Sequence, residues 1–232
     1  MNRLVIASLA ALAGALAVYA ILAPNAIDWG TVSFVAVAAL AATALALYGA
    51  RDASAQELSL VASLAALATA SRVLFAGLPN VKPVTFVVLV SGVALGPGPG
   101  FMVGATSALV SNLFFGQGPW TPWQMLAWGA TGLVGGLLGR GGRMPRRWEL
   151  VVVGALMALA FDWFVTIWMY ISFTAHTWPA FLALYARGLP FDVAHVGATA
   201  LFAGLFGVEA VRIVARFRVR TRVTFVGLED MP

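Results

Sequence analysis

Several polar or charged side chains interrupt stretches of the chain that are otherwise apolar. They are Arg72, Asn112, Gln124, Asp162, Asp192 and His195. Groups of this kind are costly in an apolar environment unless they face a partner or a cavity. Together they offer hydrogen bonding, ion pairing and proton transfer, and Asp192 and His195 lie one helical turn apart. These residues predict a polar cavity inside an apolar protein.

Most of these groups also have a structural interpretation. Asn112 and Gln124 can hydrogen-bond neighbouring helices, as most buried amides do. Arg72 and Asp162 can form an ion pair, because buried charges usually find partners. His195 can be an oriented structural imidazole instead of a ligand-binding group. The sequence leaves both interpretations open.

Signatures of catalysis and metal binding are missing from the sequence. The only lysine, Lys82, precedes a proline, so the chain has no phosphate-binding loop ending in Lys-Ser or Lys-Thr. It has no Gly-x-Ser-x-Gly elbow or His-Glu-x-x-His motif, and no partner for His195 is evident. Zero cysteines and two histidines argue against a metal centre. We predict a protein that is not an enzyme and that uses no metal or cofactor.

Membrane-spanning helices must position these residues. Hydrophobic residues make up 61% of the 232-residue chain, charged residues make up 10%, and the mean hydropathy is +0.92. About 20 apolar residues suffice for one crossing of a bilayer. The eight apolar stretches are 3–22, 31–48, 58–75, 83–96, 101–115, 123–138, 150–173 and 193–214. The predicted fold is an all-α polytopic membrane protein.

Arginine clusters predict which side of the membrane each loop faces. Four arginines lie in residues 140–147 and four more in residues 216–222. Because such clusters stay in the cytoplasm, eight crossings of the plasma membrane place both clusters and both termini inside, and leave only Lys82 and Arg187 outside. Near the cytoplasm, Glu209 can pair with Arg212 three residues on. The net charge of +5 belongs mostly to these turns and does not indicate nucleic acid.

The chain divides in composition near residue 51. Residues 1–50 are predicted to form an accessory pair of transmembrane helices, rich in alanine, leucine and valine. Residues 51–232 are predicted to form a six-helix, substrate-binding membrane core with a short basic cytoplasmic tail. A cleaved signal peptide is the alternative for 3–22, although its apolar core is long for one.

The stretch 83–96 is short, and the run Gly96-Pro97-Gly98-Pro99-Gly100 follows it. Proline lacks the backbone donor and glycine has low helical propensity. We therefore predict that the whole run is a tight turn and that the helices on either side form a close hairpin.

Two connecting loops are richer in side-chain chemistry than a connection requires. Their sequences are Leu78-Pro79-Asn80-Val81-Lys82-Pro83 and Phe114-Phe115-Gly116-Gln117-Gly118-Pro119-Trp120-Thr121-Pro122-Trp123-Gln124. Trp120 and Trp123 can be interfacial anchors, as tryptophan often is. The glycines on either side of Gln117 also suit a mobile gate over a flat, amphipathic ligand. Trp168, on the same helix as Asp162, is a further candidate wall of the cavity.

Small residues recur on the stretch 58–75. Ala62, Ala66 and Ala70 are spaced by four residues, so they share one face of a helix. A small-residue face lets another helix approach closely within lipid. The stripe predicts a helix contact, either within the chain or with another protein.

The segments 80–83 and 114–125 resemble the substrate-capturing S components of energy-coupling factor (ECF) transporters, and the similarity extends more loosely over 58–214. The first two helices lie outside the six-helix unit usual in that family. The resemblance implies that the protein binds a vitamin from outside the cell. It also implies that the protein associates with a membrane coupling subunit driven by two cytoplasmic ATPases, which agrees with the missing phosphate-binding loop. The subgroup most similar in this loop is associated with cobalamin.

The resemblance and the polar residues together define the expected sites. The substrate-binding residues are Asn80, Lys82, Asn112, Phe115, Gln117, Trp120, Trp123, Gln124, Asp162, Trp168, Asp192 and His195. By similarity to the alanine motif of S components, Ala62, Ala66 and Ala70 are expected to contact the coupling subunit. Two alternatives are an ion-coupled secondary transporter, with Asp162 and His195 as a proton relay, and a structural membrane scaffold.

Overall fold

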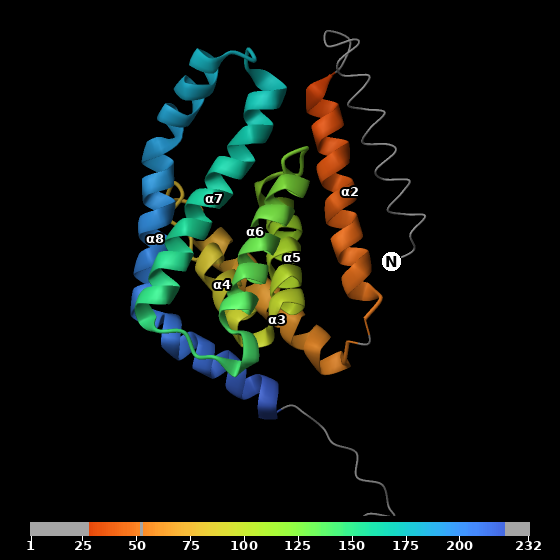
Figure 1. Cartoon of the computed structure of the whole chain (residues 1–232), viewed down its shortest axis with the longest axis vertical. Helices are drawn as coiled ribbons and strands as arrows, with labels where there is room; N and C mark the ends of the chain where they lie inside the picture. Colours follow the sequence, from red (N-terminus) through yellow and green to blue (C-terminus); the bar gives the residue numbers. More distant parts are fainter. Residues whose placement is uncertain (1–27, 52, 221–232) are drawn as a thin grey trace, which may run out of the picture.

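The computed structural model describes residues 28–51 and 53–220, and over these ranges every regular element is helical (Figure 1). The α-helices are α2 (Trp29–Gly49), α3 (Ala55–Leu74), α4 (Val84–Leu95), α5 (Pro97–Phe115), α6 (Thr121–Leu138), α7 (Arg147–Phe173) and α8 (Trp178–Arg220), with a short 3₁₀ helix η1 (Arg140–Gly142) before α7. This confirms the predicted all-α fold. The expected stretch 3–22 and the end of the basic tail lie outside the described residues.

Four of the described helices, α2, α3, α7 and α8, are long and apolar enough to cross a membrane. At a rise of about 1.5 Å per residue, the 20 residues of α3 span roughly 30 Å, the thickness of the hydrocarbon core. These helices indicate a multi-pass protein that is embedded in the membrane.

Helix α4 lies at the centre of the molecule. Eleven of its 12 residues are buried, because the helix is apolar around its whole circumference and every face needs cover from other helices. Twelve residues rise only about 18 Å, too little to cross a bilayer. The role of α4 is therefore to pack against its neighbours rather than to face lipid.

The turn between α4 and α5 is tighter than the sequence predicted. Gly96 alone reverses the chain, at φ 105° and ψ 174°, and Pro97 already begins α5. The prediction that all five residues Gly96–Gly100 form the turn was wrong. Prolines are tolerated in the first turn of a helix, where their missing N–H would have no intrahelical acceptor in any case. The predicted close hairpin is confirmed.

Glycines bring α4, α5 and α6 into backbone contact. A Cβ atom on Gly132 of α6 would lie 1.9 Å from the carbonyl oxygen of Gly100 in α5. A Cβ atom on Gly92 of α4 would lie 2.0 Å from the carbonyl oxygen of Gly132. Only glycine permits approaches of this kind, so these three positions hold the inner helices together by close packing.

Helix α8 begins earlier than predicted. The apolar pattern starts at Val193, yet α8 runs unbroken from Trp178 and includes Pro190 and Arg187. Arg187 therefore lies in a helix and not in a loop, and its position outside the membrane stays a prediction. A proline is tolerated inside a membrane helix when neighbouring groups satisfy the freed carbonyl.

The basic connections gather at one end of the molecule. The α2–α3 connection, the α6–α7 connection and the C-terminal part of α8 all lie at the lower end of Figure 1. There Glu209 pairs with Arg147 at 3.3 Å, so the predicted pairing with Arg212 was wrong. The α5–α6 loop and the α7–α8 turn lie towards the opposite end.

Substituting Gly132→Ala should lower the thermal unfolding temperature of the protein in detergent. The new methyl group would overlap a backbone oxygen that cannot rotate away, so α5 and α6 must separate, at a cost of about 1–3 kcal/mol. Gly197→Ala in α8 is the matched control, because nothing lies within 4 Å of its added Cβ. Thermal unfolding of the control should be unchanged or slightly higher. Equal unfolding temperatures for the two variants would contradict the glycine contact.

Candidate functional site

A small polar cavity lies among α3, α4, α6, α7 and α8, and we call it the Arg72 cavity. Its volume is about 80 Å³. It is lined by Arg72, Asn80, Lys82, Val84, Gln124, Trp128, Phe161, Asp162 and His195. Five predicted site residues thus meet in one place, although they come from distant parts of the sequence.

Arg72 is a buried cation that has no carboxylate partner among residues 28–51 and 53–220. It is 7% exposed and donates hydrogen bonds to the hydroxyl of Ser111 and, at 2.7 Å, to the side-chain oxygen of Asn112. Its guanidinium also lies over the rings of Phe115, at 4.5 Å, and Trp128, at 5.0 Å. Neutral acceptors and aromatic faces stabilise the cation without cancelling its charge. It therefore remains able to attract an electron-rich ligand.

The predicted ion pair between Arg72 and Asp162 was wrong. Among the described residues, Asp162 instead hydrogen-bonds His195, with 2.9 Å between Oδ2 and Nδ1. Both side chains are nearly buried, with 5% of His195 and 10% of Asp162 exposed. The cavity therefore separates a buried cation from a carboxylate that is already engaged.

His195 belongs to a series of hydrogen bonds that joins four helices, α4, α6, α7 and α8. Its Nε2 lies 2.7 Å from the hydroxyl of Thr85 in α4, and the indole N–H of Trp128 donates to that same hydroxyl at 2.9 Å. An ionised Asp162 only accepts, so the proton of a neutral His195 lies on Nδ1 and its Nε2 accepts from Thr85. Every polar group in this series of hydrogen bonds then has a partner. The arrangement supplies the partner for His195 that the sequence did not reveal.

A second set of hydrogen bonds supports the amides. Asn112 donates at 2.9 Å to Gln124 and at 2.9 Å to Thr121. Because Asn112 also accepts from Arg72, the cation and the cavity-lining amide of Gln124 are connected through one side chain. Asn112 itself lies behind the cavity wall and orients the groups that line it.

The loop between α3 and α4 closes one side of the cavity. Asn80 adopts φ 53°, a left-handed conformation that asparagine tolerates, and its side chain donates to the carbonyl of Phe191 in α8 at 3.3 Å. The amine of Lys82 lies 5.0 Å from the ring of Phe115. Burial lowers the pKa of Lys82, and the nearby positive charge of Arg72 lowers it further. Both loop residues predicted as ligands thus line the cavity.

Several predicted site residues lie elsewhere. Gln117 bends back onto α5, donating to the carbonyl of Leu109 at 2.7 Å and accepting from Thr121. Trp123 is buried beside Trp168 and Val37 of α2, and Trp120 packs edge-on against Trp168. These indoles form an aromatic cluster that joins α2, α6 and α7 instead of lining the cavity.

Asp192 is also outside the cavity lining. It accepts a hydrogen bond from the indole of Trp163 at 3.1 Å. One helical turn separates it from His195, but the two side chains use different partners. Asp192 therefore fixes α8 against α7 near the site.

Two aromatic residues that line the cavity were not predicted from the sequence. Trp128 and Phe161 stack with ring centroids 4.4 Å apart, and both line the cavity. Neither interrupts an apolar pattern, so nothing in the sequence marks them as site residues. Arg72 was predicted as one of the polar groups of a cavity, but it was not among the expected substrate-binding residues.

The bond between Asp162 and His195 predicts non-additive effects on stability. In a double-mutant cycle of Asp162→Asn and His195→Gln, followed by chemical unfolding, we expect a coupling energy of about 1 kcal/mol or more. The cycle of Asp162→Asn with Arg72→Gln is the comparison and should be closer to additive. A larger coupling for the pair that includes Arg72 would contradict the hydrogen-bond arrangement described above.

The chain matches a known family over most of its length. Residues 52–212, well over half of the chain, match the family described as ECF-type riboflavin transporter, S component. No curated protein and no solved structure matches. The matched span contains α3 to α7 and most of α8, and therefore all the residues of the Arg72 cavity. The chain belongs to the family of ECF-type transporter S components.

Proposed function

We propose that this S component captures riboflavin, or a closely related flat vitamin, in the Arg72 cavity and delivers it to an ATP-driven import complex. Family membership makes the chain a membrane transporter subunit rather than an enzyme. The substrate, the site and the direction of transport are proposals. The observation that carries them is the meeting of three features in one cavity inside the matched span. They are a cation with no carboxylate partner in the described part of the chain, two amides and stacked aromatic rings.

The chemistry of the lining suits a flat heteroaromatic ring. Riboflavin has an apolar aromatic edge and an opposite edge that carries carbonyl acceptors and an N–H donor. The indole of Trp128 and the ring of Phe161 offer apolar faces, and the amides of Asn80 and Gln124 can both donate and accept. The charge of Arg72 favours the electron-rich carbonyl edge.

The cavity must enlarge to admit such a ligand. Its volume of about 80 Å³ lies well below the roughly 300–1,000 Å³ of typical ligand pockets. We propose that the α3–α4 and α5–α6 loops, residues 75–83 and 116–120, act as the gate that opens it. Gly116, at φ 95°, offers a flexible joint, and the bonds from Gln117 to α5 would hold this loop in its closed position.

We propose that the gate faces the outside of the cell. Positive-inside orientation places the arginine-rich end, with the C-terminus, in the cytoplasm. The α5–α6 loop lies towards the opposite end of the core (Figure 1). The same rule places the N-terminus in the cytoplasm if residues 3–22 also cross the membrane.

The loop resemblance favoured cobalamin, and that identification stays a prediction. The description of the matched family supports riboflavin instead. Cobalamin is also a far larger ligand, and the closed cavity would have to open much more widely to hold it. We therefore place riboflavin first and treat cobalamin as the competitor to be tested.

We propose that α3 docks on the ECF coupling subunit, which two cytoplasmic ATPases drive. Ala62, Ala66 and Ala70 are all exposed, whereas Ala65 and Ala68 on the opposite face are buried. Over the described residues, this face of α3 is therefore open to a partner helix. An exposed small-residue face on a membrane helix supports close packing by another helix.

Replacing Gln124 with leucine should weaken riboflavin binding about fivefold. The change removes a cavity-lining amide at nearly constant size, and a hydrogen bond contributes about 1 kcal/mol. Titration calorimetry of the purified full-length protein measures the effect, with cobalamin as a second titrant. Gln56→Leu near the arginine-rich end is the matched control and should bind riboflavin normally. Equal affinity of the two variants, or tight binding of cobalamin alone, would contradict the proposed substrate site.

Substituting Ala66→Leu should abolish co-purification with a co-expressed coupling subunit, because the larger side chain holds the partner helix away from α3. Riboflavin affinity should stay unchanged, since Ala66 faces away from the core. Ala160→Leu, at an exposed alanine of α7, is the control and should leave the complex intact. A normal complex with Ala66→Leu would rule out this surface.

Uptake driven by a proton gradient without ATPases would instead favour a secondary transporter.

A further inference from the structure

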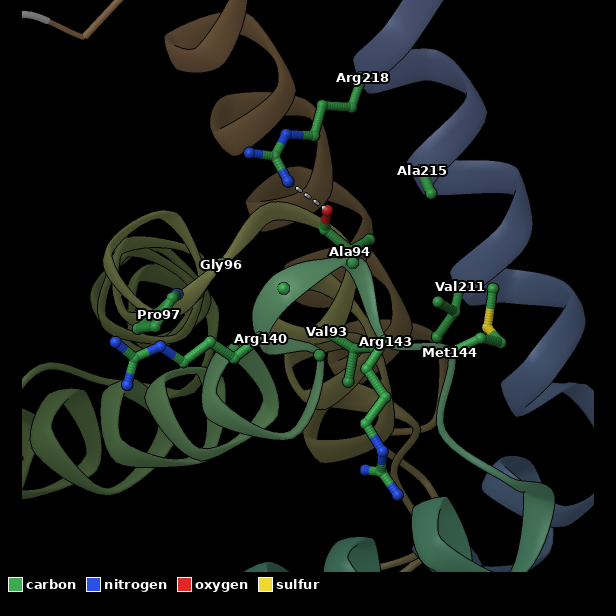
Figure 2. Close-up of a pocket in the computed structure, with 14 residues that line it drawn as sticks. Val93, Ala94, Gly96, Pro97, Arg140, Arg143, Met144, Val211, Ala215 and Arg218 are labelled. Atoms are coloured by element: carbon green, nitrogen blue, oxygen red, sulfur yellow. Dashed lines mark hydrogen bonds between the residues drawn. The ribbon is translucent and has the colours of Figure 1, made fainter.

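A second and larger cavity lies at the arginine-rich end of the protein, and it shares no lining residue with the Arg72 cavity. We call it the Arg140 cavity. Its volume is about 570 Å³. The turn between α4 and α5, the connection at 139–144 and the C-terminal part of α8 enclose it (Figure 2). Nothing in the proposed transport function uses this space.

The charges that line the Arg140 cavity are all positive. Arg140, Arg143 and Arg218 line it, and no carboxylate does. Arg218 donates to the carbonyl of Ala94 at 3.1 Å, and one amino group of Arg143 is paired with Glu149 outside the lining. The guanidinium of Arg140 has no hydrogen-bond or ion-pair partner within residues 28–51 and 53–220. The cavity therefore carries excess positive charge and at least one free guanidinium, a good partner for a phosphate group.

The remaining wall of the cavity is apolar. Val93, Met144, Val211 and Ala215 line it beside the arginines (Figure 2). Ile213, on the same part of α8, is 54% exposed, so an apolar surface continues outside the cavity. A free inorganic anion would use only the arginines. A phospholipid would use both walls, with its phosphate on the arginines and its glycerol and first methylene groups on the apolar side.

The position of the cavity supports the same ligand. At the arginine-rich end α3 and α7 begin and α8 ends (Figure 1). The positive-inside rule places such an end at the cytoplasmic surface of the membrane. Basic pockets between helices at the cytoplasmic membrane surface bind lipid headgroups. We propose that the Arg140 cavity binds the phosphate-bearing headgroup of an anionic phospholipid.

Native mass spectrometry of the full-length protein in detergent tests the proposal. Phosphatidylglycerol, phosphatidylcholine and inorganic phosphate are titrated separately. We expect one phosphatidylglycerol to bind in preference to phosphatidylcholine, and inorganic phosphate to bind much more weakly. Arg140→Ala should weaken phosphatidylglycerol binding about fivefold, the effect of roughly 1 kcal/mol per basic residue near a charged surface.

Two further variants separate the cavity from general charge. Ala215→Phe keeps every arginine but fills the apolar wall, and it should also reduce phosphatidylglycerol binding. Arg187→Ala removes one exposed arginine from α8 outside the cavity lining and should have no effect. Riboflavin titration serves as the folding control for all three variants, because none of their positions lines the Arg72 cavity.

Three results would overturn the proposal. Equal binding of phosphatidylglycerol and phosphatidylcholine would show that the headgroup charge is not recognised. Inorganic phosphate binding as tightly as the lipid would identify a simple anion site. Unchanged lipid binding in Arg140→Ala, combined with loss of the coupling subunit, would assign the cavity to a protein contact instead.

Discussion

The contact of α4, α5 and α6 through glycine is the constraint on which the rest of the structure depends. Gly92, Gly100 and Gly132 allow backbone atoms to approach where any side chain would collide. Within lipid, helices gain little from burying apolar surface against one another, so close packing must hold them together. The contact places a short, fully enclosed helix at the centre of a bundle of longer ones.

The polar site follows from this arrangement. Because α4 is central, its Thr85 can reach both Trp128 of α6 and His195 of α8. Each buried polar group in this series of hydrogen bonds has a partner, which lowers the cost of burying it in low-dielectric surroundings. Arg72 is satisfied differently, by neutral oxygens and aromatic rings. The protein thus keeps one buried positive charge that is stabilised but not neutralised, and we infer that a ligand completes the site.

Sequence patterns predicted the helical class, the membrane location and the gathering of Asn80, Gln124 and His195. These features depend on composition and on the cost of placing polar groups in lipid. Both can be judged from the types of the residues alone. The pairing of Asp162 with His195 rather than with Arg72 depends on how helices rotate against one another, which hydropathy does not encode. The aromatic wall formed by Trp128 and Phe161 was hidden for a related reason, because an indole inside an apolar helix looks like ordinary core packing.

Identification of the molecule that the protein retains on purification would test the central claim most directly. The full-length chain is expressed in cells supplied with both riboflavin and cobalamin, purified in mild detergent and denatured, and the released small molecules are quantified by mass spectrometry. The proposed site predicts a flavin in near-stoichiometric amount, reduced in the Gln124→Leu variant. Stoichiometric cobalamin, or no bound vitamin from a protein that nevertheless unfolds cooperatively, would contradict it.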